Sequence, residues 1–310
     1  MKKLLLKLAL FSGLTLIVWL GVFVITLQSY GLEYSIFGKE TNWGFTNLRS
    51  SEWGLQKELG NNVLFFGAST CYSGIDPSAL SAFGLSGFNF CSSAQGIGNS
   101  AHLILPAISS QTPQAIIVDV CPEIWGAQAP YLESTKDWII NSNLRTPEWS
   151  RAYRRLAFES GDIFTFLSSF YYDFVRKFKV AGANPYLEKD TKGDYRGLGF
   201  VARSFEPLDT IECETLKRKM SKWECGAILD IAALCSSKRI QLILINPPQL
   251  CEETFDMPPC FDGLAYIDGN AWPGAKTPRN FYDDHHLVEA GALSYSAWLA
   301  QQIASLLHAS

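Results

Sequence analysis

The stretch VLFFGASTCYSGIDP, residues 63–77, decides the fold. The apolar run from Asn62 to Phe66 is bounded by turn residues, as is typical of a buried β-strand. Ser69 follows in the turn toward the next helix, which Asp76 is expected to cap and Pro77 to begin. A serine placed there has its hydroxyl near helix N-terminal N–H groups, which favour a developing oxyanion. Most such serines only cap or line a turn, so Ser69 is at this point one candidate nucleophile.

The same alternation of short apolar strands and helices continues beyond this stretch. Further strands are expected at 87–91, 114–120 and 240–245, and helices at 48–59, 99–109, 211–236 and 288–307. Apolar strands that alternate with helices indicate a parallel sheet covered on both faces. We therefore expect an α/β domain over residues 61–310, preceded by a linker and surface helix at 29–60.

Residues 122–210 interrupt the alternation and are expected to form a helical insertion. The insertion contains an aromatic helix, Asp162–Lys179, and a polar, Gly-rich stretch at 188–199. Two interpretations of the aromatic helix remain open: a core helix whose basic end matches the helix dipole, or a helix resting on a bilayer or on a membrane partner. The apolar residues near one face of this helix are Ile163, Phe166, Leu167, Phe170, Phe174 and Phe178.

The N-terminus predicts a membrane anchor over residues 1–28. Residues 8–27 (LALFSGLTLIVWLGVFVITL) contain no charge and are long enough to span a hydrocarbon core of roughly 30 Å. Lysines before this run, and Glu33 and Glu40 after it, suit a single-pass, N-in, C-out orientation. A cleaved signal peptide is the alternative, although no A-x-A site follows the run. The domain is therefore expected outside the cytoplasm, in the periplasm or at the cell surface.

Composition narrows the class of protein. The chain has 310 residues, of which 47% are hydrophobic and 18% charged, enough for a sizeable core and too apolar for disorder. The mean hydropathy of +0.05 fits a membrane-associated chain. A net charge of −4 argues against nucleic acid as a partner, because phosphate binding needs a basic face.

The eight cysteines contain no C-x-x-C pair and no spacing with histidine that predicts zinc, so we expect no metal site. In an oxidising compartment an even number permits disulfides. Cys251 and Cys260 flank a Pro-containing loop and are the expected local bridge. Cys71, Cys91 and Cys121 each follow a predicted strand and are expected near one another at one sheet edge. Buried free thiols are the alternative for all eight.

The segment FYDDHHLVEAGALSYSAWL, residues 281–299, holds two of the four histidines beside two aspartates. Asp283 and His286 are three residues apart, a spacing that places both side chains on one side of a turn or helix start. Asp283 would then accept the Nδ1 proton of His286 and leave Nε2 free as a base for a serine. The alternative is that Asp283 or Asp284 caps the terminal helix and the histidines are simply exposed. Together with Ser69 and the parallel-sheet pattern, the catalytic interpretation is favoured.

A serine after the first strand, with D-x-x-H opening the last helix, resembles the SGNH/GDSL-type hydrolases. The chain is most similar to membrane-anchored, extracytoplasmic SGNH-like proteins, which include the D-alanyl-transfer protein of teichoic-acid operons and the alginate-type O-acetyltransferases. The resemblance covers residues 1–120 and 210–310 in order. The matching stretches are GASTCYSGIDPSAL (67–80), FNFCSSAQGIGN (88–99), the PP of LILINPP (242–248) and DDHHLVEAGA (283–292).

The resemblance implies a flavodoxin-like three-layer SGNH fold with a parallel central sheet. It implies Ser69 as nucleophile, His286 as base and Asp283 as its orienting partner. The backbone N–H groups of Ser69 and Ala94 would form the oxyanion hole. Glycine is common in the family at the position of Ala94, and alanine is compatible with a main-chain donor there if φ is negative. The third-block asparagine of simple GDSL esterases has no match in Val120–Glu123, which argues against a free-standing esterase.

The α/β-hydrolase fold also orders Ser, Asp and His but fits less well. That fold needs G-x-S-x-G, and Cys71 stands at the position of the last glycine. It also separates Asp and His widely, whereas Asp283 and His286 are three residues apart.

The expected function is therefore extracytoplasmic acyl transfer through a Ser69 ester, without a soluble cofactor. The substrate implied is a cell-envelope glycan or glycolipid, and the implied partner that supplies the acyl group is a membrane-bound O-acyltransferase. Hydrolysis of an ester or thioester would use the same three residues. A non-catalytic scaffold that binds a glycan or tethers an assembly is the third hypothesis.

Overall fold

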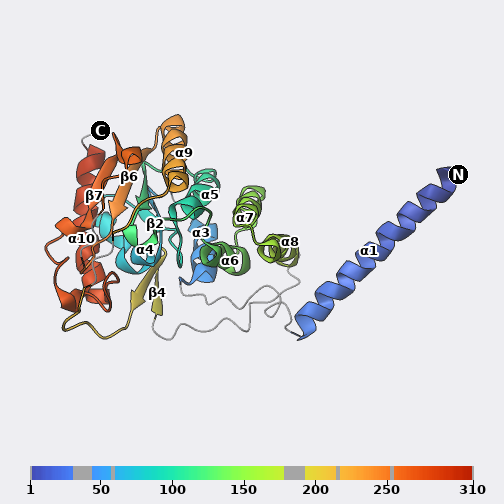
Figure 1. Cartoon of the computed structure of the whole chain (residues 1–310), viewed down its shortest axis with the longest axis horizontal. Coiled ribbons are helices and arrows are strands. Elements are labelled where there is room, and N and C mark those ends of the chain that lie inside the picture. The colour runs from blue at the N-terminus through green and yellow to red at the C-terminus, as the bar shows by residue number, and fades with distance from the viewer. Residues whose placement is uncertain are drawn as a thin grey trace.

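The computed structural model describes residues 2–30, 44–56, 60–177, 193–213, 217–251 and 255–308. Its centre is a five-stranded sheet with the order β2-β1-β3-β6-β7, in which every neighbouring pair is parallel (Figure 1). The expected α/β class with a parallel sheet is confirmed. The strands are β1 (Val63–Phe66), β2 (Gly87–Asn89), β3 (Ala115–Asp119), β6 (Gln241–Asn246) and β7 (Ala265–Asp268).

Helices cover both faces of the sheet because its inner strands are apolar on both sides. Leu64 and Phe66 of β1 belong to one buried cluster, and Val63 and Phe65 belong to the other. The first cluster lies under α5 (Ile97–Ile108) and α9 (Lys222–Lys238), with α3 (Thr46–Gln56) at its margin. The second lies under α4, η1 and α10, which are Ser69–Gly74, Pro77–Phe83 and Glu289–His308.

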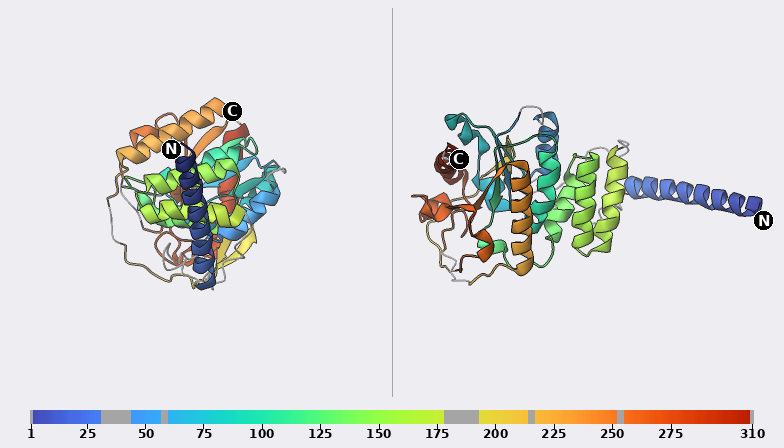
Figure 2. Two further views of the ribbon diagram at one scale, coloured as in Figure 1. Left: turned by 90° about the vertical axis from the view of Figure 1, so that its right-hand side faces the viewer. Right: turned by 90° about the horizontal axis from the view of Figure 1, so that it is seen from above.

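The insertion is helical, as predicted, and adds layers outside α5. Its helices are α6 (Leu132–Asn141), α7 (Pro147–Glu159) and α8 (Ile163–Lys177), and Figure 2 shows α7 and then α8 stacked away from the sheet. Helix α8 buries Tyr171 and Tyr172 in the first cluster, whereas Leu167, Phe170 and Phe174 are about half exposed, so α8 is only in part a core helix. An antiparallel hairpin, β4 (Gly193–Gly197) with β5 (Phe200–Arg203), follows and was not predicted. Residues 188–192 lie outside the described part.

Two further elements differ from the sequence analysis. The helix expected at 211–236 begins only at Lys222, because Ser221 and Glu224 form a capping box in which each side chain accepts a backbone N–H of the other. The edge strand β7 was missed because it is only half-buried and lacks the long apolar run of β3 and β6.

The expected Cys251–Cys260 bridge is wrong. Cys213 pairs with Cys251, and Cys225 of α9 pairs with Cys260. Both bridges tie segments that the fold brings together from 38 and 35 residues apart, and Cys260 lies in a 3₁₀ turn that packs against α9. Cys121 and Cys235 are buried free thiols.

The N-terminal helix α1 (Lys2–Tyr30) stands apart from the domain in Figures 1 and 2. Lys2–Val22 is long and apolar enough to cross a bilayer, with a mean hydropathy of 2.1, and none of it is buried against the rest of the structure. This agrees with the expectation of a lone apolar helix. The linker residues 31–43 lie outside the described part.

Candidate active site

Ser69 is placed by the end of β1. The strand leads through Gly67 and Ala68 directly into α4, of which Ser69 is the first residue. Gly67 is required because a Cβ there would lie 2.2 Å from the Cβ of Asp119, at the end of the neighbouring strand β3. The first N–H groups of α4 have no partner one turn back in the helix. Ser69 is therefore half-buried at the carboxyl edge of the sheet, at the N-terminus of α4.

His286 and Asp283 reach Ser69 from the loop before α10. His286 Nε2 lies 2.7 Å from Ser69 Oγ, across a sequence separation of 217 residues. On the other side of the ring, Nδ1 of His286 lies 2.7 Å from Asp283 Oδ2. The structure thus brings the three predicted residues together in the expected geometry, and His286 rather than His285 faces the serine.

The loop that carries His286 is held by Asp283 itself. Oδ1 of Asp283 accepts the backbone N–H of His285 at 3.0 Å and that of His286 at 2.6 Å. One carboxylate therefore closes the turn with one oxygen and orients the imidazole with the other. The Tyr282 ring stacks on the His286 ring with centroids 5.4 Å apart and planes 4° from parallel, and Phe205 stacks on Tyr282.

Electrostatics suit His286 to act as a base. Burial lowers the pKa of His286 below its usual value, and the positive charges of His285 and Arg203 lower it further, whereas the hydrogen bond that His286 donates to Asp283 acts to raise it. Burial acts to raise the pKa of Asp283, but its hydrogen bond to His286 and the charges of both histidines outweigh this and leave it lowered. Near neutral pH the pair is therefore a neutral imidazole beside a carboxylate, which is the state that can take a serine proton.

His285 pairs with Asp284 and not with the serine. Its Nδ1 lies 2.6 Å from Asp284 Oδ1, and its ring centre lies 4.0 Å from that of His286. Asp283, His285 and His286 have ligand atoms within 4.8 Å of one another, so they are the group in the described residues that could hold a metal ion. Nδ1 of His286 is already paired with Asp283 and Nδ1 of His285 with Asp284, so a metal bound through these atoms would have to displace both pairs.

A buried carboxylate beneath Ser69 was missed by the sequence analysis. Asp119, at the end of β3, accepts the Thr70 hydroxyl at 2.6 Å with Oδ2 and the Cys121 N–H at 2.8 Å with Oδ1. Burial raises the pKa of Asp119 to about 6, against these hydrogen bonds. Asp119 therefore fixes the residue next to the nucleophile. An acidic residue ending an apolar strand at the same sheet edge as Ser69 was the available signal.

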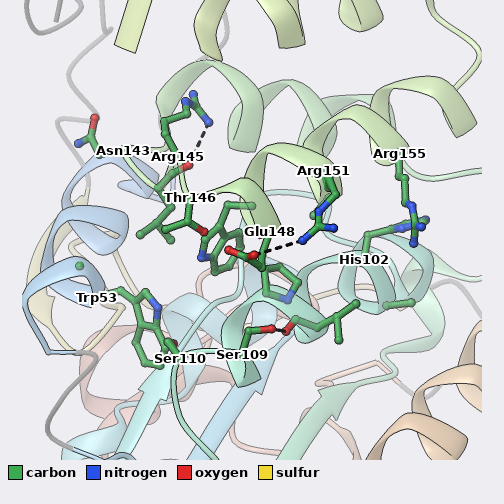
Figure 3. Close-up of a pocket in the computed structure, with 17 residues that line it drawn as sticks. Trp53, His102, Ser109, Ser110, Asn143, Arg145, Thr146, Glu148, Arg151 and Arg155 are labelled. Atoms are coloured by element: carbon green, nitrogen blue, oxygen red, sulfur yellow. Dashed lines mark hydrogen bonds and ion pairs between the residues drawn. The ribbon is translucent and has the colours of Figure 1, made fainter. Parts of the chain in front are cut away.

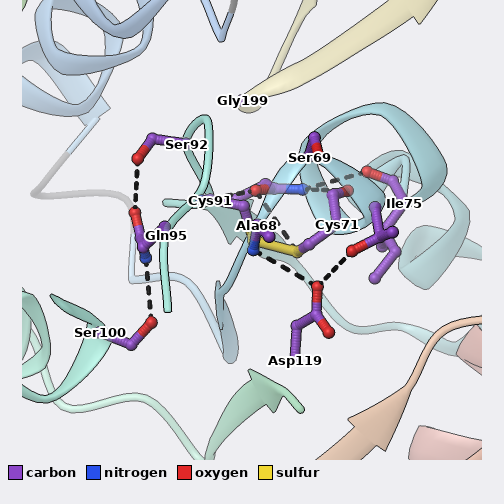
Figure 4. The surroundings of a disulfide bond; sticks show 12 residues. Ala68, Ser69, Cys71, Ile75, Cys91, Ser92, Gln95, Ser100, Asp119 and Gly199 are labelled. Carbon is purple, nitrogen blue, oxygen red and sulfur yellow. Dashed lines mark hydrogen bonds between the residues drawn. A yellow bond between two sulfur atoms is a disulfide. The ribbon is translucent and has the colours of Figure 1, made fainter. Parts of the chain in front are cut away.

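A disulfide between Cys71 and Cys91 ties α4 to the segment after β2 (Figure 4). These two cysteines were expected near one another, and the third, Cys121, remains a buried thiol that accepts a hydrogen bond from Gln249. Asn89, at the end of β2, strengthens the same junction. Its Nδ2 donates to Cys71 O at 3.0 Å, and its Oδ1 accepts the N–H of Cys91 at 2.8 Å.

The segment expected to supply the second oxyanion donor, Ser92–Gln95, follows the disulfide. The N–H of Ser92 donates to Gly67 O at 3.0 Å, so this segment lies beside the turn that carries Ser69. Ala94 has a φ of 48°, and the condition that its φ stay negative is therefore not met. This left-handed conformation favours glycine and costs an alanine about 1 kcal/mol. The role of Ala94 as a donor stays a prediction.

The inserted hairpin adds a cation to the site. Arg203, the last residue of β5, is buried and donates from Nη2 to Tyr72 Oη at 2.8 Å. The hairpin turn packs so closely on β2 that a Cβ at Gly199 would lie 2.0 Å from Asn89 O. The polar sequence of β4 gave no sign that this part of the insertion returns to the nucleophile.

Asp76 has the structural role expected of it. Its Oδ1 accepts the Ser78 N–H at 2.9 Å and caps η1, with Pro77 as the first residue of that helix. Asp76 is therefore a cap, as predicted, and takes no part in the Ser69 hydrogen-bond chain.

A separate pocket of about 850 Å³ lies between α3, α5 and the start of α7 (Figure 3). Several basic residues line it, among them His102, Arg145 and Arg151. These three already contact protein acceptors, namely Glu159, the carbonyl of Ile139 and Glu148. None of the lining residues belongs to the Ser69 site, and we assign this pocket no ligand.

No protein-family model matches the chain, and no curated protein matches it with significant similarity.

Proposed function

We propose that the chain is a membrane-anchored, extracytoplasmic serine acyltransferase. It moves an acyl group, acetyl or similar, to or from a cell-envelope polysaccharide or glycolipid through an ester on Ser69. The observation that carries the proposal is the hydrogen-bond chain from Asp283 through His286 to Ser69, with both links at 2.7 Å.

The geometry suits formation of an acyl-enzyme. His286 Nε2 takes the Ser69 proton while Oγ attacks the carbonyl carbon of the acyl donor. The Asp283 carboxylate stabilises the imidazolium that forms. Backbone N–H groups of Ser69 and Ala94 stabilise the negative oxygen of the tetrahedral intermediate. Its collapse breaks the bond to the leaving group, which receives the proton from His286.

The second half of the reaction repeats these steps in reverse. An acceptor hydroxyl gives its proton to His286 and attacks the Ser69 ester. The tetrahedral intermediate then expels Ser69 Oγ, which recovers its proton from the imidazolium. With a glycan or glycolipid hydroxyl as acceptor the reaction is transfer, and with water it is hydrolysis.

The placement of the site supports an SGNH-type, flavodoxin-like three-layer fold. Numbered along the chain, the five parallel strands have the order 2-1-3-4-5. In open sheets of this kind, sites form outside the carboxyl ends of the strands, where the order reverses. Ser69 follows β1, which lies between β2 and β3 at that reversal.

Two features support an extracytoplasmic location. Three disulfides are typical of an oxidising compartment. Helix α1 is of bilayer-crossing length. Acyl-coenzyme A is not expected in such a compartment, so we propose that a membrane-bound O-acyltransferase supplies the acyl group.

Labelling with a fluorophosphonate tests the proposal, because the probe reacts with a serine only where a base activates it. The wild type should be labelled, and Ser69→Ala should not. Ser78→Ala is the matched control, since Ser78 is an exposed serine nine residues away whose hydroxyl contacts nothing described. Equal labelling of wild type and Ser69→Ala would reject the enzymatic proposal and favour the non-catalytic scaffold.

Product analysis separates transfer from hydrolysis. The labelled acyl group should appear on an added envelope glycan or glycolipid faster than as free acid. Release of free acid at the same rate with and without acceptor would identify a hydrolase that uses the same three residues.

A further inference from the structure

Helix α8 carries large apolar side chains on its outward face as well as on its inward face. The inward face combines Tyr171 and Tyr172, which belong to the first buried cluster, with Thr165, Ser168 and Ser169, which are each no more than 2% exposed. Five further large apolar side chains face outward and are 49 to 59% exposed. Up to Phe174, every fully exposed residue of the helix is apolar. This outward face consists of Ile163, Phe164, Leu167, Phe170 and Phe174.

The inward face of α8 is fixed by specific contacts. Asp173 accepts from Arg154 Nη1 at 2.6 Å and from Ser150 Oγ at 2.9 Å, both on α7. The hydroxyls of Ser168 and Ser169 donate to carbonyls within α8 itself. Rotating the helix to bury the outward face would break the Asp173 contacts, so the apolar face is a fixed surface of the domain.

The way the chain is tethered indicates what covers this face. Residues 31–43 join α1 to the domain, and thirteen residues reach at most about 45 Å, so a bilayer crossed by α1 lies beside the domain. The domain begins next to α8: Thr46 donates to Asp137 of α6 at 2.6 Å, and α6 packs against α8. Figure 2 shows α8 as the outermost layer on the side of α1.

The composition of α8 also favours a lipid surface. Three phenylalanines, a leucine and an isoleucine without any intervening exposed charge suit insertion at the boundary of headgroups and acyl chains.

We propose that α8 lies in the interface of the bilayer that α1 crosses, with its outward face among the acyl chains. This second contact holds the domain in one orientation over the membrane. The inference rests on α1 as the anchor and is independent of the chemistry at Ser69.

Photolabelling of the full-length chain tests this proposal. The protein is reconstituted in vesicles of phosphatidylcholine and phosphatidylglycerol that contain a phospholipid with a diazirine in its acyl chain, irradiated, and mapped by mass spectrometry. Label is expected in peptides from both α1 and α8. Changing Leu167→Asp and Phe170→Asp together should reduce the α8 label by roughly tenfold or more and leave the α1 label unchanged.

Leu293→Asp is the matched control, because Leu293 on α10 is 47% exposed, close to the 51% of Leu167, and α10 covers the opposite face of the sheet. It should leave the α8 label unchanged. Label in α1 alone would overturn the proposal while keeping the anchor. Label in neither helix would reject the anchor as well. Ser69→Ala should label as the wild type does, so failure of the proposed chemistry would not be mistaken for failure of the membrane contact.

Discussion

The two halves of the Ser69–His286 site are held in different ways. On the serine side, the supports are covalent or fully buried: the Cys71–Cys91 disulfide and the side chains of Asn89 and Asp119, each no more than 1% exposed. On the histidine side, the support is a surface loop in which the Asp283 side chain is 38% exposed.

Because of this difference, substitutions on the serine side should mainly reduce stability, and substitutions on the histidine side should mainly reduce activity. Removing a support of Ser69 leaves a buried cavity or an unpaired buried group and should reduce stability. The Asp283–His286 pair lies on a loop in which Asp283 is partly exposed, so substitutions of this pair should reduce activity more than stability.

The largest effect is expected for the reacting pair. Ser69→Ala and His286→Ala should each lower kcat/KM for acyl transfer or ester cleavage by about 10⁴-fold or more, because each removes a group that acts only in the transition state. The double variant should be hardly worse than either single one, since the residues act as a unit. Thermal unfolding should stay close to wild type. If the loss of kcat/KM in the double variant equals the product of the two single losses, Ser69 and His286 do not act as a unit.

Asp283→Asn should cost less than either alanine but still on the order of several hundredfold or more in kcat/KM. Asparagine keeps an oxygen for the two backbone N–H groups, yet it cannot stabilise an imidazolium. Steady-state kinetics with thermal unfolding as control would test this. An activity within threefold of wild type would show that Asp283 only closes the loop.

On the serine side, the main expected effect of a substitution is a loss of stability. Replacing Cys71 and Cys91 together by alanine should lower the free energy of unfolding by about 3 kcal/mol, as expected for a loop of 20 residues. Activity should fall as well, because α4 loses its tie to the Ser92–Gln95 segment. Replacing Cys213 and Cys251 is the control, with a comparable loss of stability and unchanged kcat/KM in the folded state. If the Cys71/Cys91 and Cys213/Cys251 variants have the same kcat/KM, the Cys71–Cys91 disulfide does not position Ser69.

The smallest effect concerns pH. Because the pKa of His286 is lowered, kcat/KM should fall only below about pH 6.5, as the imidazole becomes protonated. Loss of the His285 charge removes one cause of that lowering, so His285→Gln should move the acid limb to higher pH by less than about one unit. A limb that moves to lower pH would contradict the assigned electrostatics.

The sequence was sufficient for the parts of the molecule that local patterns determine. The apolar runs of β1, β3 and β6 and the Asp76-Pro77 helix start are readable from neighbouring residues alone. Asp283 and His286 were found because their spacing is short and histidines are rare in this chain. The strand β7 and the hairpin β4–β5 were missed because their side chains are half-exposed or polar and carry no strand pattern.

The remaining site residues depend on tertiary placement. Asn89, Asp119 and Arg203 are ordinary polar residues in the sequence, and only the meeting of three strand ends with the inserted hairpin brings them beneath Ser69. Disulfide pairing likewise depends on which loops meet in the fold. The prediction of a Cys251–Cys260 bridge, which relied on closeness in sequence, was therefore wrong. In α8 most of the apolar stripe was recognised, but Phe166 packs inward, Phe164 lies outward in its place, and Phe178 is outside the described residues. The direction in which this face points depends on the contacts of Asp173 with α7.

The most direct test of the central claim is to trap the acyl-enzyme. The full-length protein is incubated with an activated acetyl ester, quenched in acid and mapped by peptide mass spectrometry. We predict acetylation of the peptide that contains Ser69, at Ser69 Oγ, in the wild type and not in Ser69→Ala or His286→Ala. Acetylation at another residue, or equal acetylation in His286→Ala, would contradict a nucleophile activated by the Asp283–His286 pair.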